Sequence, residues 1–206
     1  MYAQLFIALS FAIASYQDIK ERAVNDLVWI PALAGAAYVV YSYYTFQSTQ
    51  GLEFLVIKIV LIGGIALAFA FFGGIGQADA IAIAFVAADP YPLSPVPPLF
   101  AGAFVALSHI GYEYAVGNAR SGRKIPMEQF LREQRWIPKA VIADGVRTEV
   151  NRDVNVAREE VEAKKLHDAS VEVSYGVPTV AYLGIGYVAY LVYLALFNLP
   201  AFLSLP

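Results

Sequence analysis

Long apolar blocks separated by short polar segments make up most of this chain. Residues 27–44 and 178–199 contain no charged side chain, and residues 54–73 contain only Lys58. A helix needs about 20 predominantly apolar residues to cross a bilayer. All three blocks are therefore predicted to be membrane spans, with the long Lys58 side chain extending to the interface.

Three further segments extend the prediction to six spans. Residues 97–117 form a fourth block of full length, and residues 1–16 form a shorter one. That first block lacks the positively charged start of a signal peptide, so we expect a retained helix. Residues 80–88, at ~1.5 Å per residue, reach only about half the hydrocarbon thickness. Asp79, directly before this short segment, is therefore expected to lie close to the bilayer.

The distribution of lysine and arginine predicts how the spans are oriented. Thirteen of the 14 basic residues lie in residues 17–26 and 118–177, whereas residues 45–53 and 89–96 contain none. Short loops rich in these residues stay in the cytoplasm. We therefore predict a multi-pass protein of the plasma membrane, with its N-terminus outside and its long loop in the cytoplasm. Asp89 then lies on the outer side, where a solvated helix end accounts for it.

The long loop has a composition of its own. Residues 118–177 hold 21 of the 31 charged side chains, 11 basic and 10 acidic. This balance argues against a polybasic tether to lipid. Helical patterns at residues 126–134 and 155–166, with alternating patterns at 140–142 and 171–175, predict a small mixed domain.

The predicted fold class is an all-α polytopic membrane protein with six transmembrane helices and a small α+β cytoplasmic subdomain. Residues 1–117 are expected to hold the first five membrane helices. Residues 118–177 are expected to form the soluble subdomain, and residues 178–206 contain the last membrane helix.

Composition removes several classes of chemistry. The chain has no cysteine, which excludes disulfide scaffolds, thiol enzymes and cysteine-based zinc sites. A net charge of −3 gives no overall basic field for nucleic acid. The two histidines, His109 and His167, are too far apart in sequence for a helical zinc motif. We therefore predict no nucleic-acid partner, no metal and no cofactor.

Two aspartates are the leading candidates for chemistry. Asp18 directly follows the first apolar block, and Asp79 follows a glycine-rich stretch after the third. Both are predicted to lie at the cytoplasmic face at similar depth. An aspartic hydrolase needs one ionised carboxylate to activate water and one protonated carboxyl to polarise the scissile carbonyl. Like charge and desolvation let such a pair hold a single proton.

Other interpretations of these acids remain open at this point. Asp18 is also placed to cap a helix or to pair with Arg22, and Asp79 is also placed as an N-cap. Asp26 is a candidate N-cap for the second membrane helix. An ion- or proton-coupled transporter or channel also uses intramembrane carboxylates. In that alternative, Asp79 would work with Glu113 or His109, which lie one helical turn apart.

Two motifs resemble a known family. Residues 76–79, Gly-Gln-Ala-Asp, resemble the GxGD motif of membrane-embedded aspartic proteases, with Ala78 at the second glycine position. Residues 18–29, from Asp18 into Leu-Val-Trp, resemble the first-aspartate segment of type IV prepilin peptidases. The size and order of the segments resemble the archaeal branch, the preflagellin (prearchaellin) peptidases.

The resemblance implies an aspartic endopeptidase that processes signal peptides. Such an enzyme removes the short basic leader of preflagellin or type IV pilin-like precursors, the proteins of the archaellum and the type IV pilus. The resemblance implies that Asp18 and Asp79 are catalytic, with Gly76, Gln77 and Ala78 where the substrate approaches. Its expected partners are these precursors and membrane lipid, and the sequence leaves the oligomeric state open.

Overall fold

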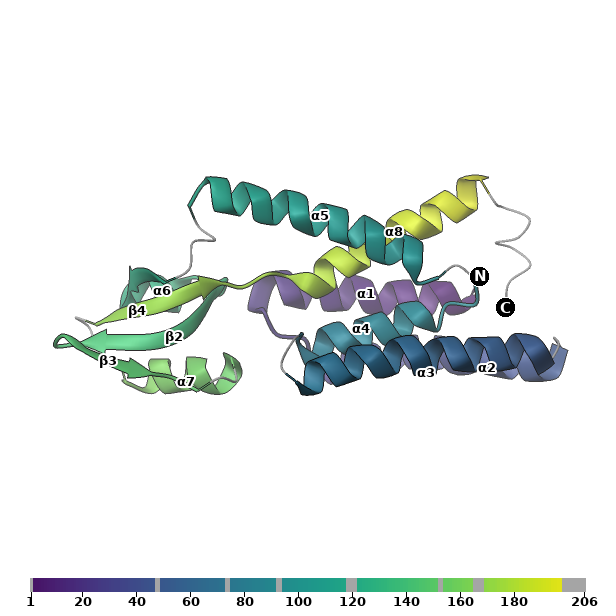
Figure 1. The fold of residues 1–206 in the computed structure, drawn as a ribbon, viewed down its shortest axis with the longest axis horizontal. Coiled ribbons are helices and arrows are strands. Elements are labelled where there is room, and N and C mark those ends of the chain that lie inside the picture. The colour runs from purple at the N-terminus through teal and green to yellow at the C-terminus, as the bar shows by residue number, and fades with distance from the viewer. Residues whose placement is uncertain are drawn as a thin grey trace. The chain divides into compact units, whose positions relative to one another are not determined.

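The chain folds into two compact units in a computed structural model (Figure 1). The first unit comprises Met1–Asp18, Val24–Ala106 and Thr179–Pro206, and the second comprises Ile19–Ala23 and Leu107–Pro178. The structure describes residues 2–46, 49–72, 75–91, 94–117, 122–151, 154–164 and 169–197.

The first unit is helical. Its elements, in chain order, are α1 (Tyr2–Glu21), the 3-10 turn η1 (Asp26–Trp29), α2 (Ile30–Phe46), α3 (Thr49–Phe71), α4 (Gln77–Ala87), the first half of α5 (Val96–Ala115) and α8 (Thr179–Phe197). Helices α3 and α4 lie side by side (Figure 1), and α4 also packs against α8. The short helix α4 is thus held between two long ones.

Within the residues that the structure describes, three helical segments are long and apolar enough to cross a membrane. They are Asp26–Phe46, Gln50–Phe71 and Thr179–Phe197. These segments match the three spans predicted most directly from the sequence. Helices α1 and α5 have 20 residues each, and α4 has 11. Membrane crossing by α1, α4 and α5, and the total of six spans, stay predictions.

Aromatic side chains fill the interior of this unit. The ring of Phe11 on α1 lies edge-on to Trp29 at 5.7 Å between centroids and against Tyr187 of α8 at 5.4 Å. All three side chains are buried. The hydroxyl of Ser10 accepts a hydrogen bond from the N–H of Ala32 at 2.9 Å, which satisfies a donor in the first turn of α2. Together these contacts fix the direction of α1.

The second unit contains a four-stranded antiparallel sheet in the order β1-β4-β2-β3 (Figure 1). Its elements are β1 (Arg123–Pro126), α6 (Met127–Arg132), β2 (Trp136–Ala143), β3 (Val146–Glu149), α7 (Val154–Lys164) and β4 (Ser170–Tyr175). Helix α7 packs against β2, and the core includes Phe130, Trp136 and Val161. The strands and helices expected within the long loop are therefore present.

Candidate active site

Asp18 lies in the last turn of α1, and its side chain is buried. One carboxylate oxygen, Oδ2, accepts a hydrogen bond of 3.1 Å from the N–H of Ala181, in the first turn of α8. The first N–H groups of a helix have no partner within it, and the helix dipole makes that end electropositive. Asp18 therefore caps the start of α8, one of the structural roles considered for it.

The segment after Asp18 is also fixed by side chains. The N–H of Asn25 donates to Oε1 of Gln17 at 2.9 Å, and Oδ1 of Asn25 accepts from the N–H of Leu27 at the same distance. Asn25 is therefore the N-cap of η1, and the expectation of this role for Asp26 is wrong. Asn25 lies one residue before Asp26 and has an extended backbone, so its side chain reaches the free N–H groups at the start of η1.

Asp79 lies in the first turn of α4, preceded by Gly76 as the N-cap. Its Oδ2 accepts a hydrogen bond of 3.2 Å from the N–H of Gly76. A Cβ atom on Gly76 would lie 3.1 Å from the same oxygen, which is tighter than ordinary contact. The glycine thus lets the chain fold back closely on the Asp79 carboxylate.

The two aspartates that the sequence analysis expects to form a pair interact electrostatically. Asp79 lies outside the three candidate spans. Burial raises its pKa to about 6, the hydrogen bond from Gly76 opposes this rise, and the nearby Asp18 carboxylate adds to it. The fold therefore brings an acid at the end of α1 close to an acid at the start of α4. A pair of this kind retains a proton at pH values where an isolated aspartate has lost it.

Gln77 and Ala78, the other residues of the motif, form the start of α4. Gln77 is exposed, whereas Ala78 is half-buried and packs against the apolar core of the unit. Position 78 has a helical backbone, which alanine adopts without strain. The second glycine position of the motif therefore does not require glycine for its conformation here. Gly73 and Gly74, of the glycine-rich stretch, lie outside the described residues.

A second polar cluster, which sequence reasoning missed, lies beyond the other end of α4. We call Lys58, Asp89, Tyr91 and Tyr187 the Asp89 cluster. Asp89 is completely buried, and its carboxylate accepts hydrogen bonds from the N–H of Tyr91 and the hydroxyl of Tyr187, both at 2.8 Å. The Lys58 ammonium donates to the carbonyl oxygens of Asp89 at 2.6 Å and Tyr91 at 3.1 Å.

These contacts overturn two expectations. Lys58, expected to extend to the interface, is buried and bound by peptide carbonyls, and Asp89, expected at a solvated helix end, is buried as well. The physical reason is mutual satisfaction, because a buried ammonium group and a buried carboxylate each cost less when they lie among hydrogen-bond partners. The sequence did contain a signal for this cluster. Lys58 and Asp89 carry opposite charges and lie at ends of apolar segments that are both predicted to face the outer side.

The structure also locates the histidine considered as a relay or ligand. Nε2 of His109 lies 3.4 Å from Oε1 of Glu113, as the spacing of four residues in α5 predicts. His167 lies outside the described residues. Within the described part of the chain, no group of three or more histidines and acidic residues is arranged to hold a metal ion.

The sequence model of the type IV leader peptidase family matches residues 5–111, more than half of the chain. The matched region contains both Asp18 and Asp79. No curated protein matches the chain.

Proposed function

The chain belongs to the type IV leader peptidase family, and on that premise we propose that it is a membrane-embedded aspartic endopeptidase. Family membership implies a protease that acts on prepilin-like precursors. The proposal adds that Asp18 and Asp79 are its catalytic pair. The observation that carries it is that the Asp18 carboxylate, on α1, adds to the burial that raises the pKa of Asp79, on α4.

The surroundings of the two acids differ, which favours a division of roles. Asp18 accepts an N–H at the start of α8, where the helix dipole favours the charged form of the carboxylate. Burial and the nearby Asp18 carboxylate raise the pKa of Asp79 to about 6, which favours its protonated form. We therefore assign the ionised, water-activating role to Asp18 and the protonated role to Asp79.

Hydrolysis then proceeds in two proton-balanced steps. Asp18 takes a proton from water as the water oxygen bonds to the scissile carbonyl carbon, and Asp79 gives its proton to the carbonyl oxygen. The tetrahedral intermediate collapses as Asp18 passes its proton to the leaving amide nitrogen and a hydroxyl proton returns to Asp79. The products are a new carboxyl group and a new amine, and both aspartates recover their starting states.

The proposed substrate is a preflagellin or type IV prepilin-like precursor, whose short basic leader is removed at the cytoplasmic face of the plasma membrane. In such a precursor a polar leader precedes an apolar helix. The apolar helix lies in the bilayer while the leader stays in water, so the bond between them lies at the interface. The family match favours this reaction over the transporter alternative.

The test is cleavage of a purified prepilin-like precursor by the protein in lipid vesicles. Asp18→Asn and Asp79→Asn are each expected to lower kcat by about a thousandfold or more, because each removes one proton-transfer group. Asp26→Asn, at an exposed position nearby, is the matched control and is expected to cut at the parent rate. Parent-like cleavage by either Asp18→Asn or Asp79→Asn, with folding verified by circular dichroism, would rule out the pair.

A further inference from the structure

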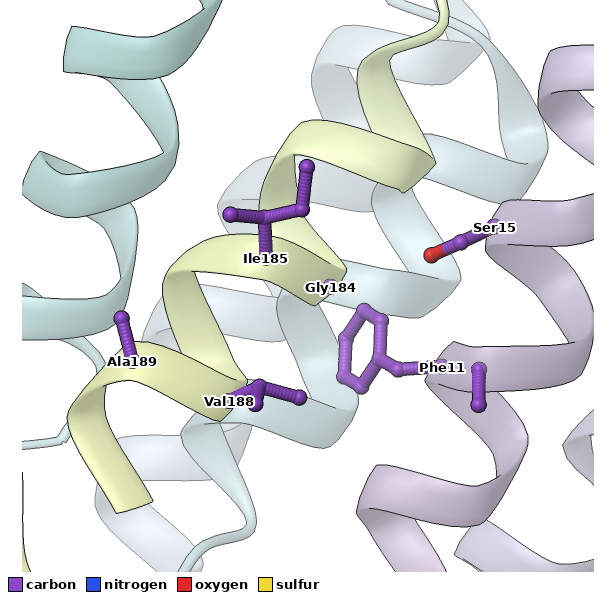
Figure 2. A pocket seen from close by; sticks show the side chains of 7 residues that line it. Phe11, Ser15, Gly184, Ile185, Val188 and Ala189 are labelled. Carbon is purple, nitrogen blue, oxygen red and sulfur yellow. The ribbon is translucent and has the colours of Figure 1, made fainter. Parts of the chain in front are cut away.

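An apolar groove runs between α1 and α8, within the first unit (Figure 2). Its volume is about 400 Å³, within the range of sites that hold ligands. The lining residues are Phe11, Ala12, Ser15, Gly184, Ile185, Val188 and Ala189. The Ser15 hydroxyl is the one polar side-chain group among these seven residues, so the groove suits an apolar occupant.

The groove begins next to the proposed catalytic pair. Ser15 precedes Asp18 by three residues on α1, and Gly184 follows Ala181 by three residues on α8. The hydrogen bond from Ala181 to Asp18 therefore lies about one helical turn beyond this end of the groove. Phe11 is seven residues before Asp18, so the groove extends roughly 10 Å from the carboxylate along α1.

Small residues open the groove toward its surroundings. Gly184 lets α1 and α8 approach closely at one end of the groove, because a Cβ atom at this position would overlap Oγ of Ser15. Ala12 and Ala189 are exposed at the edges, and the side chains of Ile185 and Val188 are about half exposed. Small residues on membrane helices let another helix pack closely against them.

We propose that this groove binds the first two turns of the apolar helix of the precursor, directly after the bond that is cut. The inference rests on the proposed function. The substrate changes from polar to apolar at that bond, so the chain following it must leave the carboxylates along an apolar surface. The groove supplies such a surface, starting about one turn from Asp18.

A second apolar hollow provides the internal comparison. It has a volume of about 280 Å³ and is lined by residues that include Ile65 of α3 and Ile83, which follows Asp79 by four residues on α4. It is smaller, and its lining has mostly branched or aromatic side chains. Ile65 is about half exposed and lines this second hollow, so it serves as the matched position.

Disulfide crosslinking tests occupancy without requiring turnover. The chain has no cysteine, so Ala12→Cys, Ala189→Cys and Ile65→Cys each introduce one thiol. Each is combined with Asp79→Asn and mixed, in vesicles, with a precursor carrying one cysteine within two turns after the cleavage site. We expect positions 12 and 189 to crosslink several-fold more than position 65. Equal crosslinking, or more at position 65, would overturn the proposal.

Filling the groove with a large side chain tests how much the groove contributes to cleavage. Ala12→Trp adds a large side chain at an exposed edge and is expected to raise KM for the full precursor about tenfold, with kcat changed less than about twofold. Ala34→Trp, at an exposed position of α2 outside the groove, is the control and should match the parent. A peptide that ends before the apolar helix should not distinguish Ala12→Trp from the parent.

The outcomes separate this inference from the proposed function. If the parent does not cut the precursor, or cuts it equally well after Asp18→Asn, the proposed function fails. If cleavage depends on Asp18 and Asp79 but Ala12→Trp matches Ala34→Trp, the groove holds something else, such as a lipid chain, and only the present inference fails. If position 12 crosslinks although the parent protein does not cut the precursor, the groove stands as a binding site and the proposed chemistry is rejected.

Discussion

Helix α4 has a carboxylate near each end, and the two carboxylates have opposite surroundings. Beyond its C-terminal end, Asp89 is fully buried among a tyrosine hydroxyl, a backbone N–H and the peptide carbonyls that bind the Lys58 ammonium. At its start, Asp79 accepts one backbone N–H and interacts with a second carboxylate, Asp18. At the C-terminal end, fixed hydrogen bonds and Lys58 offset part of the cost of burying the acid, whereas at the start the second carboxylate adds to that cost.

This difference distinguishes a structural from a chemical role for an acid beside an apolar helix. An acid whose charge is met by fixed donors and a nearby cation stabilises one arrangement of helices. An acid held near a like charge binds a proton more tightly and can release it during a reaction. Position in an apolar segment alone does not distinguish the two, since both acids border the same short helix.

The largest expected effect concerns the stability of the Asp89 cluster. If it is not observed, the contrast between the two ends of α4 is wrong. Lys58→Met and Asp89→Asn each leave buried partners unmatched, so each is expected to cost about 3–5 kcal/mol in free energy of unfolding. The double variant is expected to lose less than the sum of the two. Denaturant unfolding in detergent measures both quantities.

The control for these variants is Glu53→Gln, which changes an exposed acid on α3. It is expected to unfold like the parent. If Asp89→Asn proves as stable as Glu53→Gln but abolishes cleavage, the Asp89 cluster takes part in chemistry and the contrast between the two ends of α4 is wrong.

The second expectation concerns pH. Because the pKa of Asp79 is raised from 3.8 to about 6, the folded protein binds this proton more tightly than the unfolded chain does. The resulting stability is present below about pH 4 and is lost as the pH rises through about 6. Asp79→Asn should therefore unfold at a higher temperature than the parent at pH 8, and at a similar temperature at pH 4.

The same proton should control activity. If Asp79 must be protonated, kcat/KM falls about tenfold per pH unit above about pH 6. Initial rates of precursor cleavage between pH 4.5 and 8 measure this fall. A rate that stays constant to pH 8 would show that Asp79 does not supply a proton.

A smaller effect is expected at Gly76, where a substitution tests whether the close approach of the backbone to the Asp79 carboxylate matters for activity. Gly76→Ala places a Cβ 3.1 Å from Oδ2 of Asp79, so the carboxylate must shift by a few tenths of an ångström. We expect kcat to fall about tenfold with stability nearly unchanged, because a small displacement of a catalytic group is costly. Gly64→Ala, where a Cβ meets nothing within 4 Å, is the control, and an equal effect in both variants would contradict this account.

The smallest effect is expected at Ala78. Because this residue is helical, Ala78→Gly is expected to lower the free energy of unfolding by about 0.5–1 kcal/mol, with kcat within about threefold of the parent. Unfolding and cleavage measured on the same preparation provide the test. A large gain in activity would instead indicate that the Ala78 methyl group obstructs the substrate.

Much of the membrane unit could be predicted from the sequence, because hydrophobic length is a local property. The segments at residues 27–44, 54–73 and 178–199 required only a count of apolar residues. Asp18 and Asp79 were identified as candidates since an acid next to an apolar segment is costly and therefore informative. In the long loop, periodicity likewise predicted α6, α7, β2 and β4, but it did not predict β1 and β3.

The tertiary structure decided which side chains meet. Asp18 contacts Ala181, 163 residues further along the chain, and Lys58 meets the chain around Asp89. Neither contact can be predicted from the local pattern of apolar residues, because both depend on which faces of separate helices pack together. The sequence by itself thus determined where the apolar helices and the costly charges are. Only packing decided that one acid is matched by fixed partners while the other shares its site with a like charge.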